Sequence, residues 1–376
     1  MKYNYPFLDL ATTNQPMMAD LVAAATRVIT SVRYIGGSEV EAFEQELAGI
    51  THTEFAVGLS NGMDALRLSL RALVNLGRLK EGDAVIVQAN TFIASVLAIT
   101  DAGLEPWLVD IDSVTLQPSV EQIEDAARRG AKAFMPVHLY GTPVWNDEIK
   151  SVVERFGLWV VEDNAQAIGA TASASGLGSR GSVTTGSLGH VGAMSFYPTK
   201  NIGALGDAGA VTTDDPEIAA MVRTLANYGS DRRYHNIVEG FNCRLDPIQA
   251  AMLRVKLGHL DEEISRRRAI AESYCRNIMA DTVSVPALFP GSVWHQYVIS
   301  TPRRDELQQW LADNGVSTDI HYATPPHQQP CYSNTLGHLQ LQATELAARS
   351  ILSLPVGNHI KPDDAAIISQ IINQFH

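Results

Sequence analysis

The chain has 376 residues, of which 45% are hydrophobic and 18% charged, so it is a folded protein long enough for a large domain followed by a smaller one. Its formal charge of −13, from 28 basic and 41 acidic side chains, argues against binding nucleic acid through a basic surface. Three cysteines without a CxxC pair indicate neither a disulfide framework nor a zinc site, and no apolar window reaches the ~18 residues of a membrane span, so we expect a protein of the reducing cytoplasm.

Strands and helices alternate along the first two thirds of the chain. We expect helices over residues 20–31, 38–49 (capped by Ser38) and 119–129. Short apolar strands are predicted at 55–58, 84–87, 106–109, 133–137, 158–162, 192–194 and 209–213. This alternation predicts an α/β fold with a mostly parallel sheet that helices cover on both faces. Residues 176–189, rich in Gly, Ser and Thr, are predicted to form a polar loop.

A candidate phosphate site follows the strand at 55–58. Gly62 opens a leucine-rich helix there, and a glycine turn at a helix start leaves backbone N–H groups free beside the positive end of the helix dipole. Many helices begin in this way without a ligand, however. The negative charge of Asp64 in the first turn also disfavours an anion.

Asp163 is the first candidate for chemistry, because it directly follows the apolar strand at 158–162. A carboxylate at the carboxyl end of a parallel strand lies where α/β sheets hold their ligands. Paired with a pyridine nitrogen, it would keep the ring protonated, as pyridoxal phosphate (PLP) chemistry requires. The alternative is an ordinary helix N-cap.

Lys200 is the second candidate. It follows the apolar run 192–194 and Pro198, and it precedes three glycines in a span too rich in Gly for a stable helix. A lysine on a tight loop at the end of a buried strand is partly desolvated, which lowers its pKa and lets it act as a nucleophile and proton carrier. The alternative is a surface lysine in a flexible loop. The combination of Lys200 with Asp163 favours a Schiff-base lysine.

Three blocks of sequence carry a resemblance to a known family: VVEDNAQAIGA, MSFYPTKNIGALGDAGAVTTDD and GFNCRLDPIQAAMLRVKL. They are similar to the signature blocks of the PLP-dependent nucleotide-sugar aminotransferases, the DegT/StrS family of fold type I. Similar blocks run from near residue 7 to near residue 357. The resemblance implies a mostly parallel seven-stranded sheet flanked by helices in a large domain over residues 1–250, and a smaller C-terminal α+β domain over 251–376.

The resemblance also implies roles for single residues. Lys200 would carry the cofactor as a Schiff base, Asp163 would pair with the ring nitrogen, and Gln166 would hold the phenolic oxygen of PLP. Gly62 and Met63 would offer backbone amides to the PLP phosphate.

Three further cofactor contacts are implied in the same way. Phe92 would stack on the ring, Ser195 would bind the phosphate within the same chain, and Asn242 would reach the phosphate of the neighbouring subunit across a homodimer interface. From the sequence alone, a core Phe, a plain serine at a strand end and a turn residue before a helix are the alternatives. Position 208 is Ala where the family leads us to expect Gly, which matters only if the backbone there has a positive φ.

The substrate is predicted from the blocks NYGSDRRYHN and FNCRLDPIQAA, which are most similar to enzymes acting at C3 of dTDP-3-keto-6-deoxyhexoses. Tyr228, His321 and Tyr322 would then lie on the substrate side, and L-glutamate would be the amino donor. His295, His321 and His327 are too widely separated for an obvious metal motif, so we expect no metal.

Three alternatives to this function remain at the level of the sequence. One is an aminotransferase of dTDP-4-keto-6-deoxyhexoses. Another is a dehydratase, in which histidine replaces the lysine, and Lys200 speaks against it. The third is a regulatory protein that keeps the fold without the chemistry, which has no need of both Asp163 and Lys200.

Overall fold

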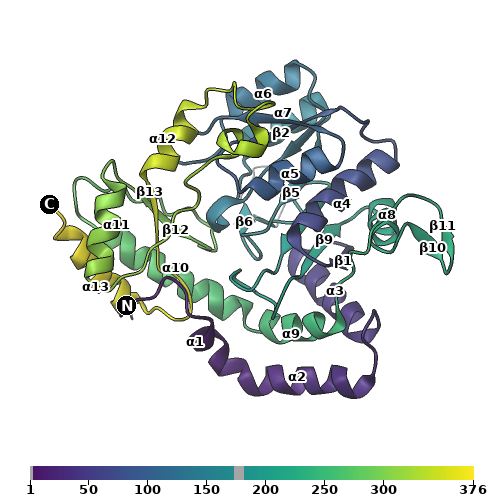
Figure 1. The fold of residues 1–376 in the computed structure, drawn as a ribbon, viewed down its shortest axis with the longest axis horizontal. Helices are drawn as coiled ribbons and strands as arrows, with labels where there is room; N and C mark the ends of the chain where they lie inside the picture. Colours follow the sequence, from purple (N-terminus) through teal and green to yellow (C-terminus); the bar gives the residue numbers. More distant parts are fainter. Residues whose placement is uncertain (1–2, 173–181) are drawn as a thin grey trace.

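A seven-stranded sheet forms the centre of the molecule in the computed structural model, which describes residues 3–172 and 182–376 (Figure 1). Residues 176–181 of the predicted polar loop lie outside the described residues. The strands follow in the order β1 (Phe55–Leu59), β9 (Gly209–Thr213), β8 (Val191–Ser195), β5 (Trp159–Asp163), β4 (Ala133–Met135), β2 (Ala84–Gln88) and β3 (Glu105–Val109). The strand β9 runs opposite to the other six strands of this sheet, which are parallel to one another. The predicted mostly parallel sheet is therefore confirmed.

Alternate residues of each strand pack against helices on opposite faces of the sheet, as the two-residue period of a strand requires. In β2, Val85 and Val87 belong to one hydrophobic cluster, while Ala84 and Ile86 belong to another. The first face is covered by α4 (Gly62–Asn75), α5 (Ile93–Asp101) and α8 (Pro216–Ala226). The second face is covered by α6 (Val120–Arg128), α7 (Asp147–Phe156), α3 (Ser38–Thr51) and α9 (Pro247–Leu257).

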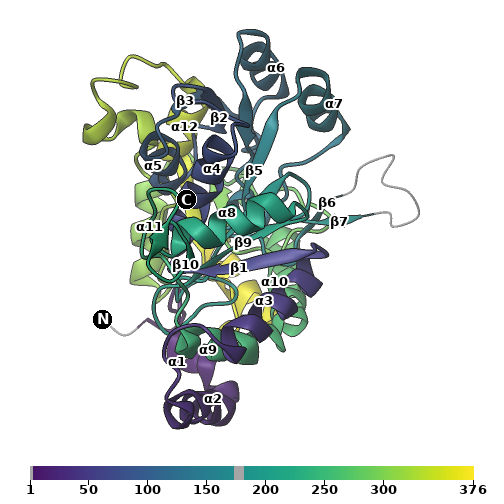
Figure 2. The same cartoon turned by 90° about the vertical axis from the view of Figure 1, so that its right-hand side faces the viewer.

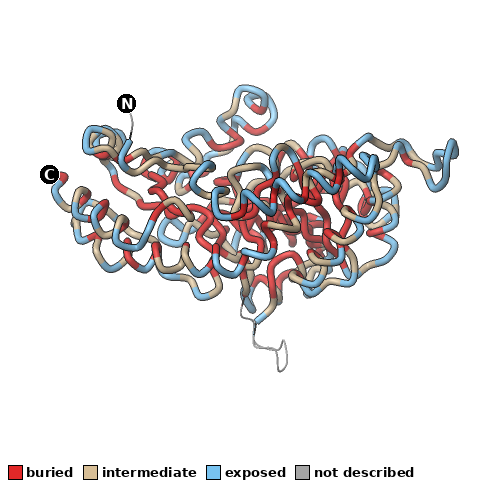
Figure 3. The backbone as a smooth tube through the Cα atoms, turned by 90° about the horizontal axis from the view of Figure 1, so that it is seen from below, coloured by how far each residue is buried: buried red, intermediate tan, exposed pale blue. Residues whose placement is uncertain are grey.

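Figure 2 shows how the second set of helices divides, with α6 and α7 at the β3 end of the sheet and α3 and α9 at the β1 end. Most residues of the sheet are buried between the two helix layers, the edge strand β3 is only partly buried, and exposed residues lie on the outside of the molecule (Figure 3). The buried strand ends are therefore accessible only where loops leave room between the layers.

The C-terminal part forms a separate hydrophobic cluster around Tyr274 and Tyr297, which are fully buried. It contains the antiparallel pair β12 and β13 and several helices, with α10 leading from α9 into this part (Figure 1). Their bounds are α10 Leu260–Asn277, β12 Tyr297–Ser300, α11 Arg304–Asp313, α12 Gln342–Ser350, β13 Ile351–Leu354 and α13 Pro362–Asn373. The division into domains of residues 1–250 and 251–376 stays a prediction.

The remaining helices and strands lie outside the seven-stranded sheet and the helices that cover it. They are α1 Leu10–Asn14, α2 Met18–Ser31, β6 Thr171–Ala172, β7 Val183–Thr184, β10 Ser230–Arg232 and β11 His235–Asn236. The hairpin of β10 and β11 projects from the body beyond α8 (Figure 1). None of the helices in the described residues has the length and apolar character needed to cross a membrane.

Two local expectations can be compared with the backbone. The N-cap of α3 is Gly37, at φ 91°, and not Ser38, because the chain enters the helix through a left-handed turn that glycine tolerates. Ala208 is not among the described residues with positive φ, so it needs no glycine. At Gly209, by contrast, a Cβ would lie 2.3 Å from the backbone of Asn61, so only glycine fits there.

Candidate active site

A cavity of about 570 Å³ opens at the carboxyl ends of β1, β2, β4, β5 and β8. Because these strands run in the same direction, the segments that follow them meet at one edge of the sheet. The cavity brings together nine of the sequence-predicted residues: Gly62, Met63, Phe92, Asp163, Gln166, Ser195, Lys200, His321 and Tyr322. The last two come from the C-terminal part, so the cavity lies between the sheet and that part.

The start of α4 and the end of β8 are in direct contact at one side of the cavity. A Cβ added to Gly62 would lie 2.4 Å from Cβ of Ser195, so glycine is required for this contact. Asn61 caps the helix by accepting a hydrogen bond from the amide of Asp64 at 2.8 Å. The amides of Gly62 and Met63, which have no acceptor within the helix, are left for a ligand.

The charge of Asp64, which disfavours an anion at this helix start, is neutralised in the structure. Its Oδ1 accepts a hydrogen bond from Arg67 at 2.5 Å, and its Oδ2 is bonded by the side chains of Ser60 and Asn61. The carboxylate is therefore engaged within α4 and the turn before it. The phosphate site predicted from the glycine turn is thus electrostatically feasible.

Asp163 is the last residue of β5, is 6% exposed and lies in the cavity wall. Its Oδ2 accepts a hydrogen bond from Ser95 Oγ at 2.7 Å, and its Oδ1 accepts one from the amide of Ala165 at 3.2 Å. No helix begins at this point of the chain, so the alternative of a helix N-cap does not apply. The carboxylate is buried with two donors, and its remaining lone pairs are available to the cavity.

Lys200 lies on a turn after β8, where its amide donates to the carbonyl of Tyr197 at 2.8 Å. Burial lowers the pKa of its amine to about 8, while the negative charge of Asp163 acts in the opposite direction and raises it. Lys200 lines the cavity, which does not fit the alternative of a surface lysine in a flexible loop. An amine with this pKa is neutral in a substantial fraction of molecules near neutral pH, as a nucleophile must be.

Gln166 links the sheet to the C-terminal part of the cavity. Its Oε1 accepts from the amide of Tyr140 at 2.6 Å, and its Nε2 donates to the hydroxyl of Tyr322 at 3.2 Å. The ring of Tyr322 packs against Phe92 with 5.1 Å between ring centroids. Phe92 is 50% exposed, so it is a wall residue of the cavity and not a core Phe.

Asn242 and Tyr228 do not line the cavity of their own chain. Asn242 is exposed and Tyr228 is about half exposed, at the base of the projecting hairpin. The guanidinium of Arg244 lies 5.5 Å from the centre of the Tyr228 ring and donates to Asn227 Oδ1 at 2.9 Å. The roles of Asn242 and Tyr228 therefore stay predictions that require a second subunit.

Two histidines of the site have partners that were not predicted from the sequence. His138, which follows β4, lines the cavity and is bonded to the fully buried Glu162 at 2.8 Å. His295 bonds Asn201 Oδ1 at 2.9 Å, and its pKa is held well below the usual range by burial and by the charge of Lys200. Of these residues, only His138 carries a sequence signal, because it is a polar residue directly after a predicted strand.

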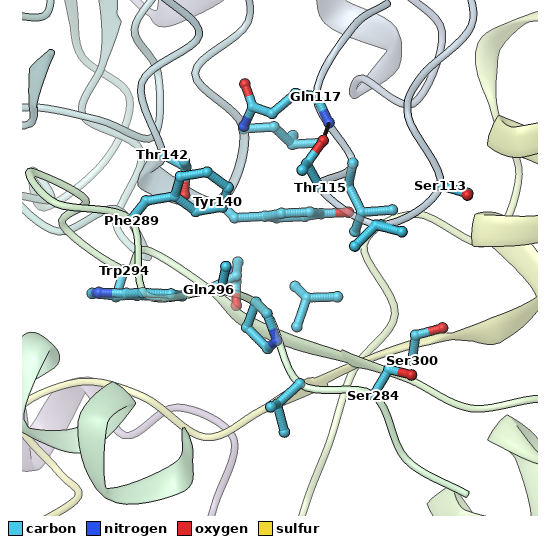
Figure 4. A pocket seen from close by; sticks show the side chains of 17 residues that line it. Ser113, Thr115, Gln117, Tyr140, Thr142, Ser284, Phe289, Trp294, Gln296 and Ser300 are labelled. Atoms are coloured by element: carbon cyan, nitrogen blue, oxygen red, sulfur yellow. Dashed lines mark hydrogen bonds between the residues drawn. The ribbon is translucent and has the colours of Figure 1, made fainter. Parts of the chain in front are cut away.

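A second, smaller cavity of about 180 Å³ adjoins the first and shares Leu139 and Gln296 with it. Tyr140 and Trp294 form aromatic walls, and the hydroxyl of Thr115 accepts a hydrogen bond from the amide of Gln117 (Figure 4). None of the described residues that line it is charged. This cavity therefore offers hydrogen-bond donors but no cationic side chain to a carboxylate or phosphate group.

The residues of the larger cavity fit pyridoxal phosphate on three independent counts. The glycine contact between α4 and β8 leaves a cradle of amides for a phosphate, Asp163 is a carboxylate suited to a pyridinium nitrogen, and Lys200 is a desolvated amine. Bound there, the cofactor would supply a carbonyl group for condensation with amines and a ring that stores an electron pair.

The model of the DegT/DnrJ/EryC1/StrS aminotransferase family matches residues 16–373. The chain belongs to this family. The chain is 40% identical to dTDP-3-amino-3,4,6-trideoxy-alpha-D-glucose transaminase of Streptomyces venezuelae, over 98% of this chain and 96% of the relative. It is 42% identical to the erythromycin biosynthesis sensory transduction protein EryC1 of Saccharopolyspora erythraea, over 96% of each.

Solved members of the family share the fold over nearly the whole length. DesV of S. venezuelae, in complex with a ketimine intermediate, superposes with a TM-score of 0.92 at 39% identity, over 100% of this chain and 98% of DesV. NtdA of Bacillus subtilis, with bound cofactor PMP, has a TM-score of 0.87 at 28% identity, over 99% of this chain and 88% of NtdA. The predicted family and the predicted fold type are both confirmed.

Proposed function

We propose that this chain is a PLP-dependent sugar aminotransferase that converts a dTDP-3-keto-6-deoxyhexose to the 3-amino sugar, with L-glutamate as the amino donor. The observation that carries the proposal is that Lys200 and Asp163 face one cavity at the carboxyl ends of parallel strands. The choice of C3 is supported by the 40% identity to a dTDP-3-amino sugar transaminase. The product would serve a deoxyamino sugar of a lipopolysaccharide, S-layer or antibiotic glycan, made in the cytoplasm.

The residues of the cavity have different roles in such a reaction. Asp163 holds the proton on the ring nitrogen, and the amides of Gly62 and Met63 with Ser195 Oγ hold the phosphate. Lys200 Nζ takes the proton from Cα of the amino donor and, in the second half of the reaction, returns a proton to the sugar carbon that receives the amine. The packing of Phe92 against Tyr322 keeps water from the reacting atoms.

The active enzyme is proposed to be a homodimer with composite sites. A sugar diphosphate and glutamate are anions, yet none of the described residues in the cavity wall is an arginine. The segment that carries Tyr228 and Asn242 also carries the exposed Arg232 and Arg233 on the projecting hairpin. A partner subunit that inserts this segment would supply the missing positive charge.

A regulatory function is the second candidate, because the relative EryC1 bears the name of a sensory transduction protein. The half-buried Lys200 in the cavity wall and the buried Asp163 favour the enzyme, since a purely regulatory protein gains nothing from a desolvated amine. A 4-aminotransferase remains the alternative within the same chemistry.

One assay distinguishes these candidates. The purified protein is loaded with pyridoxamine phosphate and offered a dTDP-3-keto-6-deoxyhexose or its 4-keto isomer, and the return of the cofactor absorbance of the PLP form is followed. We expect the 3-keto isomer to restore this absorbance. A response to the 4-keto isomer alone would overturn the proposed amination at C3. A response to neither isomer would overturn the proposal that the chain is an aminotransferase of these sugars.

A further inference from the structure

Asp163 is held from behind the cavity by a chain of two hydroxyl groups. Ser95 Oγ lies 2.7 Å from Asp163 Oδ2, and Thr91 Oγ1 lies 2.7 Å from Ser95 Oγ. Thr91 and Ser95 are each only 1% exposed, so water does not compete for these bonds. Ser95 lies in the first turn of α5, the helix after β2, whereas Asp163 ends β5. The chain of bonds therefore ties two neighbouring segments of the cavity edge together.

The direction of both hydrogen bonds follows from the chemistry of the groups. An ionised carboxylate only accepts hydrogen bonds, so the single proton of Ser95 Oγ points to Asp163. Ser95 Oγ then has only lone pairs left, so Thr91 must be the donor between the two hydroxyl groups. The other carboxylate oxygen accepts from the amide of Ala165. Rotation of the Asp163 carboxylate would break a bond to each of its oxygens, so its plane is fixed.

We propose that Ser95 is a positioning residue for the transamination reaction, which keeps the carboxylate of Asp163 turned toward the pyridine nitrogen of the cofactor. Thr91 supports it by fixing the proton of Ser95. Ser95 is not in the cavity wall, so it acts through Asp163, whereas Thr91 does line the cavity. This inference rests on the proposed function, because it requires PLP in the cavity. A charge-assisted bond in a buried site is worth more than one in water, so its loss is measurable.

The test measures cofactor affinity, independently of turnover. Cofactor-free protein is titrated with PLP, and the dissociation constant is read from the absorbance of the bound form. We expect Ser95→Ala to raise the dissociation constant about tenfold, which corresponds to about 1.4 kcal/mol and to one lost hydrogen bond. Thr91→Val should raise it less, because its effect on Asp163 is indirect. Ser95→Thr and Thr91→Ser keep the hydroxyl groups and should stay close to the wild type.

The matched control is Ser369→Ala. Ser369 is also fully buried in a helix, and its hydroxyl donates to the carbonyl of Ala365 at 2.7 Å, in α13 and outside the cavity. It should leave the dissociation constant unchanged. A second readout is the pH at which the absorbance of the bound cofactor changes, which should shift in Ser95→Ala and stay constant in the control.

The outcomes separate this inference from the proposed function. If the wild type does not bind PLP, the proposed function itself is wrong. If the wild type binds PLP and Ser95→Ala binds it with the same affinity and pH profile, only the role of Ser95 is overturned. An equal loss of affinity in Ser95→Ala and Ser95→Thr would also overturn it, because the hydroxyl would then not be the group that matters.

Discussion

Burial and a neighbouring negative charge act in opposite directions on the amine of Lys200. Burial lowers its pKa to about 8, and Asp163 raises it, so burial has the larger effect. The neutral amine is the nucleophile, and its fraction increases as the pH rises through 8. We therefore expect the rate at which cofactor-free protein captures PLP to increase with pH and to level off above about pH 8. Stopped-flow absorbance measures this rate.

The variant Asp163→Asn tests whether the negative charge of Asp163 raises the pKa of Lys200. Without the negative charge, the ammonium form of Lys200 loses a favourable interaction, so the midpoint of the capture rate should move to lower pH. A midpoint near the ordinary lysine pKa, or one that does not respond to Asp163→Asn, would contradict the electrostatic account.

For single residues, the sequence predicts the site best where a reactive residue type follows a predicted strand. Asp163 was predictable because it is a reactive residue type directly after an apolar strand, a rule that also finds His138, and Lys200 because it lies on a Gly-rich loop a few residues after one. The hydrogen-bond partners of Ser95 and His295 were not predictable, since they lie on elements far away in the sequence. Which hydroxyl or imidazole meets which carboxylate depends on packing that no local pattern encodes.

Among the elements of the fold, β5 is held in place by Glu162, the residue before the candidate catalytic Asp163. Glu162 is fully buried, accepts from the amides of Gly186, Leu188 and Gly189, and is bonded to His138. An amide side chain would present a donor where only an acceptor fits. We expect Glu162→Gln to lower the free energy of unfolding by roughly 2–4 kcal/mol in urea titrations. The exposed Glu121→Gln is the control, and an equally small loss in both would show that Glu162 has no such role.

Tyr140 joins the sheet to the C-terminal elements of the cavity. Its amide donates to Gln166, and its hydroxyl donates to the carbonyl of His321 at 2.5 Å. Tyr140→Phe removes only the second bond, so the segment of His321 and Tyr322 should be less well positioned for the sugar. We expect KM for the keto sugar to rise about tenfold, the effect of one lost hydrogen bond, in steady-state kinetics.

The control for this variant is Tyr332→Phe, whose hydroxyl is bonded to Thr100 Oγ1 at 2.9 Å outside the cavity. The affinity for PLP should be unchanged in both variants. If Tyr140→Phe left KM unaltered, or changed it only as much as Tyr332→Phe does, the hydroxyl of Tyr140 would have no part in placing the substrate.

At the scale of the whole molecule, the composite site makes a quantitative prediction. Lys200→Ala and Asn242→Ala should each be inactive or nearly so. If the two residues come from different subunits, a mixed dimer of these variants contains one intact site. Random reassociation of equal amounts should then restore about a quarter of the wild-type activity, because half of the dimers are mixed and each has one of two sites. If no activity returned after verified subunit exchange, Lys200 and Asn242 of one active site would come from the same subunit.

The fold class was predictable from the sequence, whereas the order and directions of the strands were not. Alternating strands and helices indicate a parallel sheet, and the family resemblance adds its seven strands. The strand order and the reversal of β9 depend on contacts between distant segments, such as the register of Leu59 with Gly209. The projecting hairpin likewise has no apolar pattern, and its residues 231–237 are exposed.

The most direct test of the central claim is to find where the cofactor is attached. The protein is incubated with PLP, reduced with borohydride and digested, and the modified peptide is identified by mass spectrometry. The account predicts that the pyridoxyl group is on Lys200 alone and that Lys200→Ala acquires no label. Label on another lysine, such as the buried Lys256, which lines a small cavity beside Lys200, or no label at all, would contradict it.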